Sequence, residues 1–354
     1  MLERTEILIP VGGFLTPTEP VHPLVEGPWQ DCLGDLAQGR RVLLVGERRV
    51  VDAHDLEVDI ILAGGERQKS LEAATQLARD LVVSGIDRNH LLVAIGGGAT
   101  TDLVGFVASV TLRGIPWLPI PTTTLAMVDA SIGGKTAVNL PEGKNLVGSF
   151  HQPEGVIVDR RLLTSLPHAR RMEGLIELVK TALCHGALGE KVLAAGSVEE
   201  LEALLFHGAQ VKLDLVSRDP LDKGPRQALN LGHTVGHALE ALFMPRLSHG
   251  EAVAIGMAID ARYAEQSGLI GGDELARIVG LLEGVGLCTW HDALDKVGAD
   301  GRRAVLAGLE EFREHLGGDL TLVMPAGIGR VTEVHEVDTD RVLGAIEWLK
   351  ARSH

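Results

Sequence analysis

Residues 229–240 read Leu-Asn-Leu-Gly-His-Thr-Val-Gly-His-Ala-Leu-Glu, and Ser-His-Gly-Glu follows at residues 248–251. Because residues four apart lie on one face of an α-helix, His233 and His237 are predicted to point into the same space. His249 begins the next helical run. A lone histidine on an apolar helix is usually a hydrogen-bonded core residue. Three histidines within 17 residues, among glycines and small apolar residues, instead favour a metal or catalytic site.

The composition of the whole chain is that of a globular enzyme. Its 354 residues are 45% hydrophobic and 3% aromatic, with 43 glycines, which favours a compact α/β protein with one large or two smaller domains. The formal charge of −15 argues against nonspecific binding of nucleic acid, which needs a broad basic surface. An anionic substrate therefore has to be met by local basic residues.

The cysteines and the apolar segments give an expectation for location. Cys32, Cys184 and Cys288 are far apart and odd in number, so the sequence suggests neither a disulfide framework nor a thiolate zinc site. No basic N-terminal segment leads into an apolar run, and no apolar stretch reaches the roughly twenty residues that a bilayer crossing needs. We expect a cytoplasmic protein that binds neither membranes nor nucleic acid.

The periodicity of apolar residues predicts two different halves. The first half alternates short apolar runs at 41–46, 59–62 and 91–95 with a helical pattern at 70–83, which is the βαβ rhythm of a parallel sheet. From about residue 166 the pattern changes to amphipathic helices, with candidates at 170–186, 197–214, 227–243, 251–267 and 272–285. The predicted fold class is α/β plus all-α, with an α/β domain over residues 1–164 and a helical domain over residues 165–354.

Several polar groups follow the predicted strands, where α/β sheets bind ligands. Glycines 96–98 let a backbone approach pyrophosphate closely, and the helix start behind them favours an anion. The run does not match G-x-G-x-x-G, so phosphate binding and tight packing both stay open. Glu47 follows another strand end, where a carboxylate can accept hydrogen bonds from ribose hydroxyls, and residues 65–69 follow a third.

The densest polar tract is residues 121–145. Its hydroxyls, amides, glycines and lysines suit a phosphorylated polyol, although a turn-rich connection with solvated lysines is the alternative. Further on, Glu177 and Lys180 share one helical face, which indicates either a surface ion pair or a buried carboxylate that needs a cation. With His233 and His249, Glu177 would complete a set of two histidines and one carboxylate.

Taken together, segments 96–102, 121–145, 174–180, 226–240 and 249–256 resemble the 3-dehydroquinate synthase family, in order and over most of residues 64–329. The stretches Val-Asp-Ala-Ser-Ile-Gly-Gly-Lys-Thr at 128–136 and 229–237 are the most specific. The resemblance implies a Rossmann-like NAD-binding domain, a helical metal-binding domain and a homodimer. It also implies a divalent metal, zinc or cobalt, and a phosphorylated sugar acid as substrate.

The resemblance also assigns residues to these ligands. It implies that Glu177, His233 and His249 hold the metal. It places at NAD the residues Glu47, Glu66, Lys69, Gly97, Gly98, Asp102, Thr122, Thr123 and Lys144. It places at the substrate the residues Asp129, Lys135, Asn145, Lys180, Lys212, Arg226, Asn230 and His237. Arg113 matches an arginine that reaches the phosphate of the neighbouring subunit's substrate.

The implied activity is that of a phosphate-eliminating carbon–oxygen lyase of the shikimate pathway, which leads to chorismate and the aromatic amino acids. It converts 3-deoxy-D-arabino-heptulosonate 7-phosphate into 3-dehydroquinate and phosphate. The steps are a transient NAD-dependent oxidation, elimination of phosphate, re-reduction and intramolecular aldol closure. NAD is therefore regenerated in each turnover, and the protein supplies orientation and charge.

The chain departs from the family pattern in places. Phe312-Arg313-Glu314 stands where the family generally has Asp-Lys-Lys, so a phosphate-side lysine is missing or replaced by Arg313, which differs from lysine in reach and geometry. Residues 99–101 read Ala-Thr-Thr in place of the commoner Val-Ile-Gly, Arg49 replaces a frequent Asn, and Pro225 a frequent Leu.

The sequence leaves three alternatives. One is another sugar-phosphate cyclase that makes a valiolone- or inosose-type product, which the missing lysine favours. Another is a metal- and NAD-dependent polyol dehydrogenase on the same fold, which would leave NADH behind. The third is a helical interaction domain with structural histidines, which would leave the polar tract near Asp129 unexplained.

Overall fold

The structure, a computed structural model, describes residues 4–7, 21–222, 224–243, 247–298, 301–315, 322–335 and 337–353. The chain forms two compact units. The sheet unit comprises Pro17–Gly174 and Leu205–Leu221, and the helical unit comprises Met1–Thr16, Leu175–Leu204 and Asp222–His354. Each unit is described by itself. Residues 205–221, which the sequence predicts to lie in the helical half, belong to the sheet unit.

The sheet unit is built on four parallel strands in the order β4-β3-β5-β6. Their bounds are Val42–Glu47 for β3, Ile60–Leu62 for β4, Leu91–Gly96 for β5 and Trp117–Pro121 for β6. Every residue of β5 is buried, as expected for a strand inside a parallel sheet that is covered on both faces. The three strands predicted from the sequence are confirmed to within one residue at each end.

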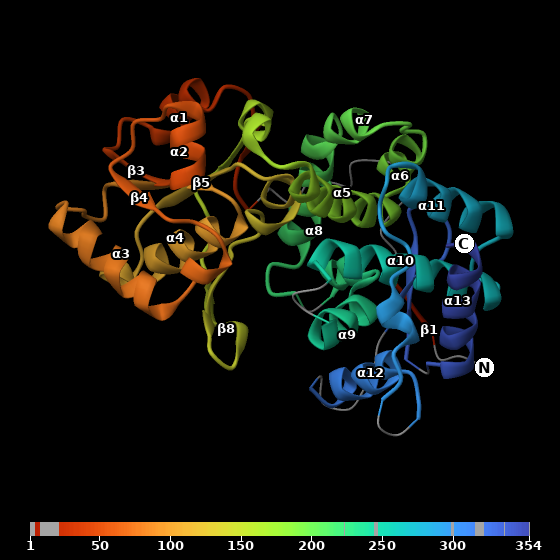
Figure 1. Cartoon of the computed structure of the whole chain (residues 1–354). Coiled ribbons are helices and arrows are strands. Elements are labelled where there is room, and N and C mark those ends of the chain that lie inside the picture. Colours follow the sequence, from red (N-terminus) through yellow and green to blue (C-terminus); the bar gives the residue numbers. More distant parts are fainter. Residues whose placement is uncertain are drawn as a thin grey trace. The chain divides into compact units, whose positions relative to one another are not determined.

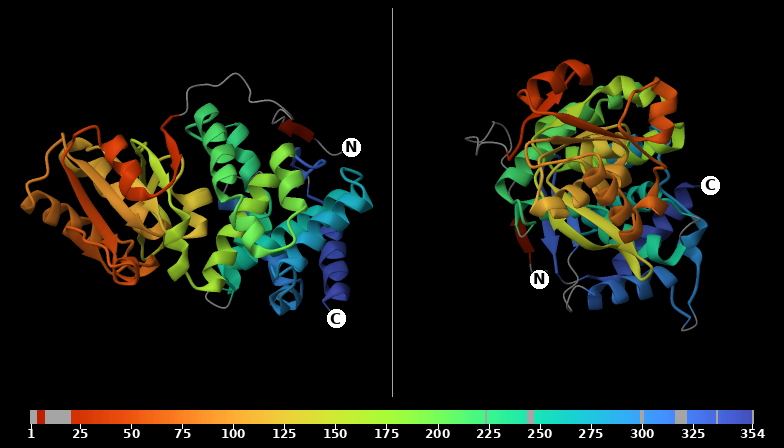
Figure 2. Two further views of the ribbon diagram at one scale, coloured as in Figure 1. Left: turned by 90° about the horizontal axis from the view of Figure 1, so that it is seen from above. Right: turned by 90° about the vertical axis from the view of Figure 1, so that its left-hand side faces the viewer.

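Helices cover both faces of this sheet (Figures 1 and 2). One core lies between the sheet and helices α3 and α4, and a second lies between the sheet and helices α1 and α2. The helix predicted at 70–83 is confirmed as α3, and Ser70 caps it by accepting a hydrogen bond from the Ala73 amide. The bounds are Trp29–Ala37 for α1, Arg48–His54 for α2, Leu71–Val83 for α3 and Gly98–Val110 for α4.

Smaller elements complete the sheet unit. The strands β2 (Leu24–Glu26) and β9 (Val156–Val158) pair in parallel, and β7 (Lys135–Leu140) and β8 (Gly143–Phe150) form a hairpin. The helix α8 (Leu205–Arg218) packs against η3 (Ala126–Ala130), a single π-helical turn. The remaining 3₁₀ turns are η1 (Glu66–Gln68), η2 (Thr111–Arg113) and η4 (Arg160–Ser165).

The helical unit is centred on α10 (His249–Gln266), which is buried along most of its length and packs against α9, α11, α13 and β10. The unit also contains a three-stranded antiparallel sheet in the order β1-β11-β10. The other helices are α5 (His168–Leu183), which belongs to this unit from Leu175 onward, α6 (Gly186–Leu193), α7 (Val198–Glu202), α9 (His233–Phe243), α11 (Gly272–Gly284), α12 (Ala304–His315) and α13 (Thr339–Arg352). The short elements are β1 (Arg4–Ile7), β10 (Leu322–Pro325), β11 (Val331–Val334), η5 (Pro225–Asn230) and η6 (Asp292–Asp295).

Two helix predictions are wrong in their extent. The predicted helix at 197–214 is two helices, α7 and α8, with a turn at Ala203 and Leu204, after which the chain enters the sheet unit. The predicted helix at 227–243 is interrupted before His233. Gly232 has a φ of +76°, which a right-handed helix does not contain, so it separates the 3₁₀ turn η5, which ends at Asn230, from α9, which begins at His233.

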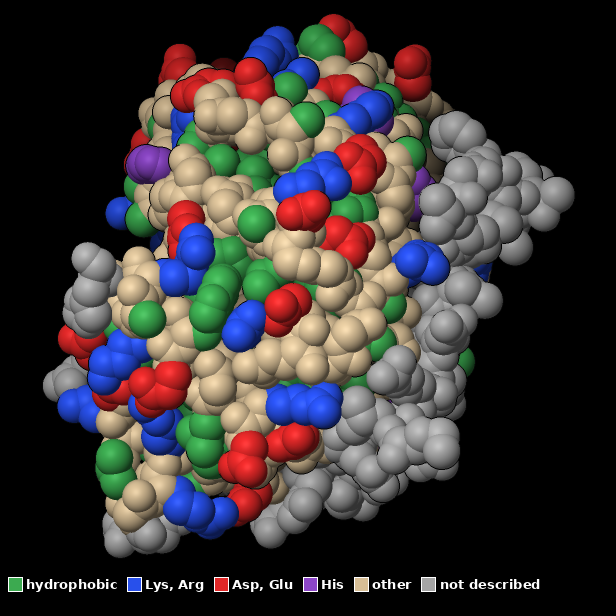
Figure 3. Space-filling view, turned by 90° about the vertical axis from the view of Figure 1, so that its right-hand side faces the viewer, with side chains coloured by type: hydrophobic (Ala, Val, Ile, Leu, Met, Phe, Trp, Pro, Cys, Tyr) green, Lys and Arg blue, Asp and Glu red, His purple; other side chains and the backbone are tan. Residues whose placement is uncertain are grey.

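Charged side chains on one face of the molecule are dispersed rather than grouped. Figure 3 shows Lys and Arg side chains interspersed with Asp and Glu side chains. Exposed ion pairs such as Arg277–Glu190 and Arg352–Glu283 belong to the helical unit. Among the described residues, no helix combines the length and the apolar character that a membrane crossing requires.

Close packing between α9 and α10 depends on glycine. A Cβ on Gly256 would overlap the carbonyl oxygen of Gly232, and one on Gly236 would lie 3.2 Å from the Ala252 carbonyl oxygen. Because these positions lack side chains, the first turn of α9 can approach α10 closely. The histidines at the starts of both helices are thereby held in the same part of the unit.

We predict that Gly256→Ala lowers the free energy of unfolding, by about 1–3 kcal/mol, because the added methyl group has no room. Gly280→Ala is the matched control: Gly280 also lies in a helix, α11, but its added Cβ would meet open space. The control should be neutral or stabilising by up to about 1 kcal/mol. Urea unfolding of both variants measures the difference, and equal effects would contradict the packing argument.

Candidate functional site

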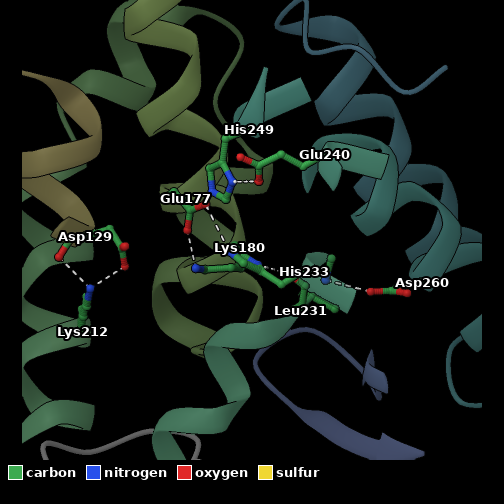
Figure 4. Close-up of polar contacts among 10 residues, drawn as sticks. Asp129, Glu177, Lys180, Lys212, Leu231, His233, Glu240, His249 and Asp260 are labelled. Atoms are coloured by element: carbon green, nitrogen blue, oxygen red, sulfur yellow. Dashed lines mark hydrogen bonds and ion pairs between the residues drawn. The ribbon is translucent and has the colours of Figure 1, made fainter. Parts of the chain in front are cut away.

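The structure brings Glu177, His233 and His249 together in the helical unit (Figure 4). Glu177 lies on α5, and the two histidines are the first residues of α9 and α10. Nε2 of His249 lies 3.3 Å from Glu177 Oε1, and Nε2 of His233 lies 3.6 Å from the same oxygen. Two imidazoles and one carboxylate with converging donor atoms are a suitable set for a zinc-like cation.

The Glu177 carboxylate is held in its charged form although it is buried. Its side chain is 1% exposed, and Lys180, one turn later on α5, forms an ion pair with it and is also buried. Burial raises the pKa of Glu177, but Lys180 and the two histidines outweigh burial and hold the pKa well below its ordinary value. Within the described residues, neither carboxylate oxygen has a partner at regular hydrogen-bond geometry. A buried anion of this kind fits a cation as its partner.

The two imidazoles turn the same nitrogen toward Glu177. Nδ1 of His233 donates to the carbonyl oxygen of Leu231 at 3.1 Å, and Nδ1 of His249 donates to Glu240 Oε2 at 3.0 Å. Burial lowers the pKa of His233 to about 3, so this ring is neutral. Burial also lowers the pKa of His249, but its contacts with Glu177 and Glu240 prevail and raise it to about 10. A divalent cation at these nitrogens would take the place of that proton.

The third histidine of the motif lies beside this group. The ring centroid of His237 is 5.2 Å from that of His233 and 6.2 Å from that of His249. Burial lowers the pKa of His237, which favours the neutral ring. Arg226, which is buried, and Asn230, which is exposed, both lie on η5 just before α9.

In the sheet unit, two of the predicted nucleotide residues, Glu47 and Gly97, lie where the strand order reverses. Glu47 ends β3, and its Oε2 accepts hydrogen bonds from the Gly97 amide at 3.1 Å and from Thr100 Oγ1 at 2.9 Å. Gly97 is the N-cap of α4 behind the neighbouring strand β5. The carboxyl ends of β3 and β5 form the switch point at which open α/β sheets bind ligands.

The groups beside this edge are closely packed. A Cβ on Gly97 would lie 3.0 Å from the Thr123 side chain, so glycine at this position allows Thr123 to lie close to the start of α4. Thr122 follows β6, and its buried Oγ1 has no hydrogen-bond partner within the described residues. Gly98 is the first residue of α4, where amides point toward the helix start.

Lys69, Asp102 and Asn145 form one network, although the resemblance divides them between NAD and substrate. Lys69 Nζ donates to the Asp102 carboxylate and to Asn145 Oδ1, and only 4% of its side chain is exposed. Burial raises the pKa of Asp102 to about 6, although the charge of Lys69 opposes this shift. Asn139 extends the network by donating to Glu66 Oε1 at 2.7 Å.

A second buried lysine in the sheet unit pairs with Asp129. Lys212 Nζ, on α8, lies 2.5 Å from Asp129 Oδ1 and 2.6 Å from the Asp129 carbonyl oxygen. Asp129 belongs to the π-helical turn η3, and such turns are frequent at functional sites. The predicted substrate and cofactor lysines of the β7–β8 hairpin, Lys135 and Lys144, are both exposed.

Arg113 stands apart from these groups, at the end of η2. It is exposed and has a φ of +66°, and the preceding Leu112 has a φ of +50°. Two consecutive non-glycine residues with left-handed backbone are uncommon, and such strain occurs at functional positions. The side chain of Arg313, proposed to replace the missing lysine, lies outside the described residues.

Sequence reasoning missed the residues that support the site. Glu240 stands in the quoted motif, three residues after His237, but the sequence alone gives it no role. Asp260 of α10 is 1% exposed, and its Oδ2 accepts a hydrogen bond from the Gly232 amide at 2.8 Å. It thereby holds the residue that breaks the helix before His233. Nothing in the sequence distinguishes Asp260 from an exposed helical aspartate.

Comparison with known proteins places this arrangement in a family. The family model described as 3-dehydroquinate synthase N-terminal matches residues 59–173, and the one described as 3-dehydroquinate synthase C-terminal matches residues 174–302. The chain belongs to the 3-dehydroquinate synthase family. A 3-dehydroquinate synthase of Rhodopseudomonas palustris is 35% identical over 87% of this chain and 86% of its own length. That of Symbiobacterium thermophilum is 39% identical over 82% of each.

Several solved structures share the fold of the chain. A 2-epi-5-epi-valiolone synthase from Streptomyces hygroscopicus, with NAD⁺ and Zn²⁺ bound, is 26% identical with a TM-score of 0.78, covering 96% of this chain and 100% of that one. A 2-deoxy-scyllo-inosose synthase, complexed with carbaglucose-6-phosphate, NAD⁺ and Co²⁺, is 26% identical with a TM-score of 0.72, covering 92% and 95%. A probable glycerol dehydrogenase from Sinorhizobium meliloti, 19% identical over 94% and 97% of the chains, has the same fold with a TM-score of 0.59.

We predict that Asp260→Asn changes the pH dependence of stability. Burial raises the pKa of Asp260 to about 8, above the roughly 3.9 of an unfolded aspartate. As the pH rises, the native state therefore keeps the proton of Asp260 up to a higher pH than the unfolded state does. The stability from this group is complete below pH 4 and is lost as the pH rises through 8. Asparagine stays neutral, so its stability relative to the wild type should increase across this range, by up to about 1.4 kcal/mol per pH unit. Urea unfolding of the wild type and the variant from pH 5 to 9 measures this difference in stability. A difference that does not change with pH would refute the prediction.

Proposed function

We propose that this protein converts 3-deoxy-D-arabino-heptulosonate 7-phosphate into 3-dehydroquinate and phosphate, using NAD and a divalent metal ion. The observation that carries the proposal is the convergence of Glu177, His233 and His249 in a chain of the 3-dehydroquinate synthase family. NAD supplies a reversible hydride acceptor, so the reaction leaves no net oxidation. The metal ion supplies Lewis acidity toward the substrate's oxygens.

The metal ligands in this proposal are Glu177, His233 and His249. The fit rests on the chemistry of the donors: a buried carboxylate that stays charged and two imidazoles whose Nε2 atoms face it. Three protein ligands leave positions for substrate oxygens, as catalytic zinc sites do. Zn²⁺ is bound in the related valiolone synthase structure, and Co²⁺ in the inosose synthase structure.

NAD is proposed to bind at the carboxyl edge of the parallel sheet. The Glu47 carboxylate would accept hydrogen bonds from ribose hydroxyls, and the amides at the start of α4 would face the pyrophosphate. Lys69, held by Asp102 and Asn145, supplies a positive charge in a defined position. The complete set comprises Glu47, Glu66, Lys69, Gly97, Gly98, Asp102, Thr122, Thr123 and Lys144.

The substrate's anionic groups need buried or aligned cations, and the chain supplies them. Lys180 and Lys212 are each buried and paired with a carboxylate, which fixes the position of both side chains. Burial lowers the pKa of His237 and so favours the neutral ring, the form in which an imidazole can act as a general base. The proposed substrate set comprises Asp129, Lys135, Asn145, Lys180, Lys212, Arg226, Asn230 and His237. These groups orient the substrate and exchange protons with its hydroxyls.

The proposal includes a homodimer in which Arg113 contacts the substrate of the neighbouring subunit. Arg113 is exposed on a strained turn at the end of α4. An apolar groove between α3 and α4 includes Val82, Val83 and Val110, which are 60%, 87% and 55% exposed. An exposed apolar face beside a strained arginine suits a subunit interface.

We also propose that the protein is located in the cytoplasm, where its three free cysteines would stay reduced.

Complementation between two inactive variants tests the shared site. Lys180→Ala removes a cation from a subunit's own site, and Arg113→Ala removes the arginine offered to its neighbour. Each variant alone should be nearly inactive, but subunits mixed through unfolding or co-expression should regain about a quarter of wild-type activity, because half of the dimers carry one complete site. Activity of a separated, differently tagged mixed dimer checks this. No recovery in a confirmed mixed dimer would exclude the shared arginine.

A second candidate is a cyclase acting on a sugar phosphate without the carboxylate. Two observations favour it: the related solved structures are a valiolone synthase and an inosose synthase, and Phe312-Arg313-Glu314 lacks the family's lysines. The curated relatives at 35% and 39% identity are named 3-dehydroquinate synthases, which favours the first candidate.

The deciding assay follows phosphate release and NADH absorbance together. With the heptulosonate phosphate, catalytic NAD and Zn²⁺, we expect phosphate release many times greater than the NAD present, without accumulation of NADH. A parallel reaction contains a heptulose 7-phosphate that carries a hydroxymethyl group in place of the carboxylate. Turnover of this compound alone would support the second candidate. NADH formed in proportion to substrate would indicate a polyol dehydrogenase. Lys180→Ala, checked for folding by circular dichroism, is the inactive control.

A further inference from the structure

The two imidazoles of the metal group are anchored by different partners. His233 donates its Nδ1–H to a backbone carbonyl, that of Leu231. His249 donates its Nδ1–H to a side chain, the carboxylate of Glu240, at 3.0 Å. A backbone carbonyl is fixed by the fold, whereas a side chain can be replaced without moving the chain. The anchoring of His249 is therefore a separate property of the sequence.

We propose that Glu240 is a positioning residue of the metal site, which fixes His249 so that its Nε2 faces Glu177. The inference rests on the proposed function, because it concerns the metal ion that this function requires. Glu240 acts through His249 and not on the substrate. A carboxylate behind a ligating imidazole fixes its tautomer and its ring orientation, and it makes the other nitrogen a stronger donor.

The exposure of the two rings explains why His249 needs such a partner. The His249 side chain is 31% exposed, compared with 13% for His233. A partly exposed ring at the first residue of a helix has fewer neighbours to restrict its rotation, and ordering it costs conformational entropy. Glu240 is only 15% exposed, so its own position is better defined. The hydrogen bond therefore restricts the rotation of the more exposed His249 ring by tying it to the better packed Glu240 side chain.

Helix geometry places Glu240 correctly for this role. Glu240 follows His233 by seven residues on α9, which corresponds to two turns and the same face. One helix thus supplies a ligand at its first residue and an anchor for the ligand of the next helix. His249 itself is held at the start of α10 by the capping box of Ser248 and Glu251. Figure 4 shows Glu240 on the side of the His249 ring away from Glu177.

Direct ligation by Glu240 is the competing explanation. His237, Glu240 and His249 also have donor atoms within 4.8 Å of one another. In the observed geometry, however, Nδ1 of His249 carries the proton donated to Glu240, while Nε2 faces Glu177. A second cation at Nδ1 would need this proton to leave and the ring to bridge two metal ions. Positioning requires neither, and metal stoichiometry separates the two explanations.

Zinc affinity tests the proposal without any substrate. Metal-free wild type, Glu240→Gln and Glu240→Ala are titrated with Zn²⁺ alone in competition with a chromophoric chelator. We expect about one Zn²⁺ per chain in each, with the dissociation constant of Glu240→Ala raised roughly 10- to 100-fold. Glutamine can still accept the Nδ1–H but carries no charge, so Glu240→Gln should fall between the wild type and Glu240→Ala.

Two controls make the result specific. Glu190→Gln removes a carboxylate that is 59% exposed and paired with Arg277 in the same unit, and it should leave Zn²⁺ affinity unchanged. His233→Ala removes a proposed ligand and should abolish tight binding. Circular dichroism and thermal unfolding of the metal-free proteins verify that the Glu240 variants are folded. The visible spectrum of the Co²⁺-loaded proteins reports the ligand set, and its band positions should shift in Glu240→Ala.

Zinc affinity of Glu240→Ala equal to that of the wild type would overturn the proposal while leaving the metal site intact. Two Zn²⁺ per wild-type chain and one in Glu240→Ala would also overturn it, because Glu240 would then be a ligand. If the wild type bound no Zn²⁺ and no Co²⁺, the metal-dependent function itself would fail. The failure of the inference and that of the proposed function are thus distinguishable.

Discussion

The buried charge of Glu177 is the constraint on which the helical unit depends. A carboxylate with 1% exposure loses its hydration, and this loss has to be offset by partners held at close range. Lys180 is one such partner, and the imidazole of His249, which Glu240 of α9 also contacts, is another. Three helices, α5, α9 and α10, must therefore meet at one point. The glycines between α9 and α10 make that meeting possible.

The same electrostatic arrangement recurs in the sheet unit with the roles reversed. There the buried groups are the ammonium groups of Lys69 and Lys212, and each pairs with a carboxylate on a neighbouring element. Each pair joins segments distant in sequence, since Lys69 meets Asp102 and Lys212 meets Asp129. Paired buried charges of this kind keep a positive group in a defined place without leaving it unsatisfied. Such groups suit recognition of a phosphorylated, multiply hydroxylated ligand.

The sequence predicted most of the architecture, because strands and long helices leave periodic apolar patterns. The apolar runs of β3, β4 and β5 and the capped start of α3 needed no tertiary information. The break at Gly232 was missed because a glycine within a helical pattern is compatible with a continuing helix. The division between α7 and α8 was missed because their apolar spacing gives no sign that the two helices pack in different units.

The site was predictable to the extent that residue types reveal chemistry. Histidines four and sixteen residues apart suggested a metal group, and the structure shows His233 and His249 beside Glu177. The roles of Glu240 and Asp260 depend on contacts between helices, which no local pattern encodes. The joining of Lys69 to Asn145 is likewise a product of the β7–β8 hairpin returning toward η1.

Within the described residues, the chain passes between the two units at residues 174–175, 204–205 and 221–222. No single cut in the backbone therefore separates the units into two uninterrupted fragments. A chimera that exchanged one half for that of a relative at residue 174 would bring in a foreign α8, and with it a foreign counterpart for Lys212 beside Asp129. Asp129 and Lys212 are thus constrained to change together, although the thirty residues 175–204 of the helical unit lie in sequence between the two segments that carry them.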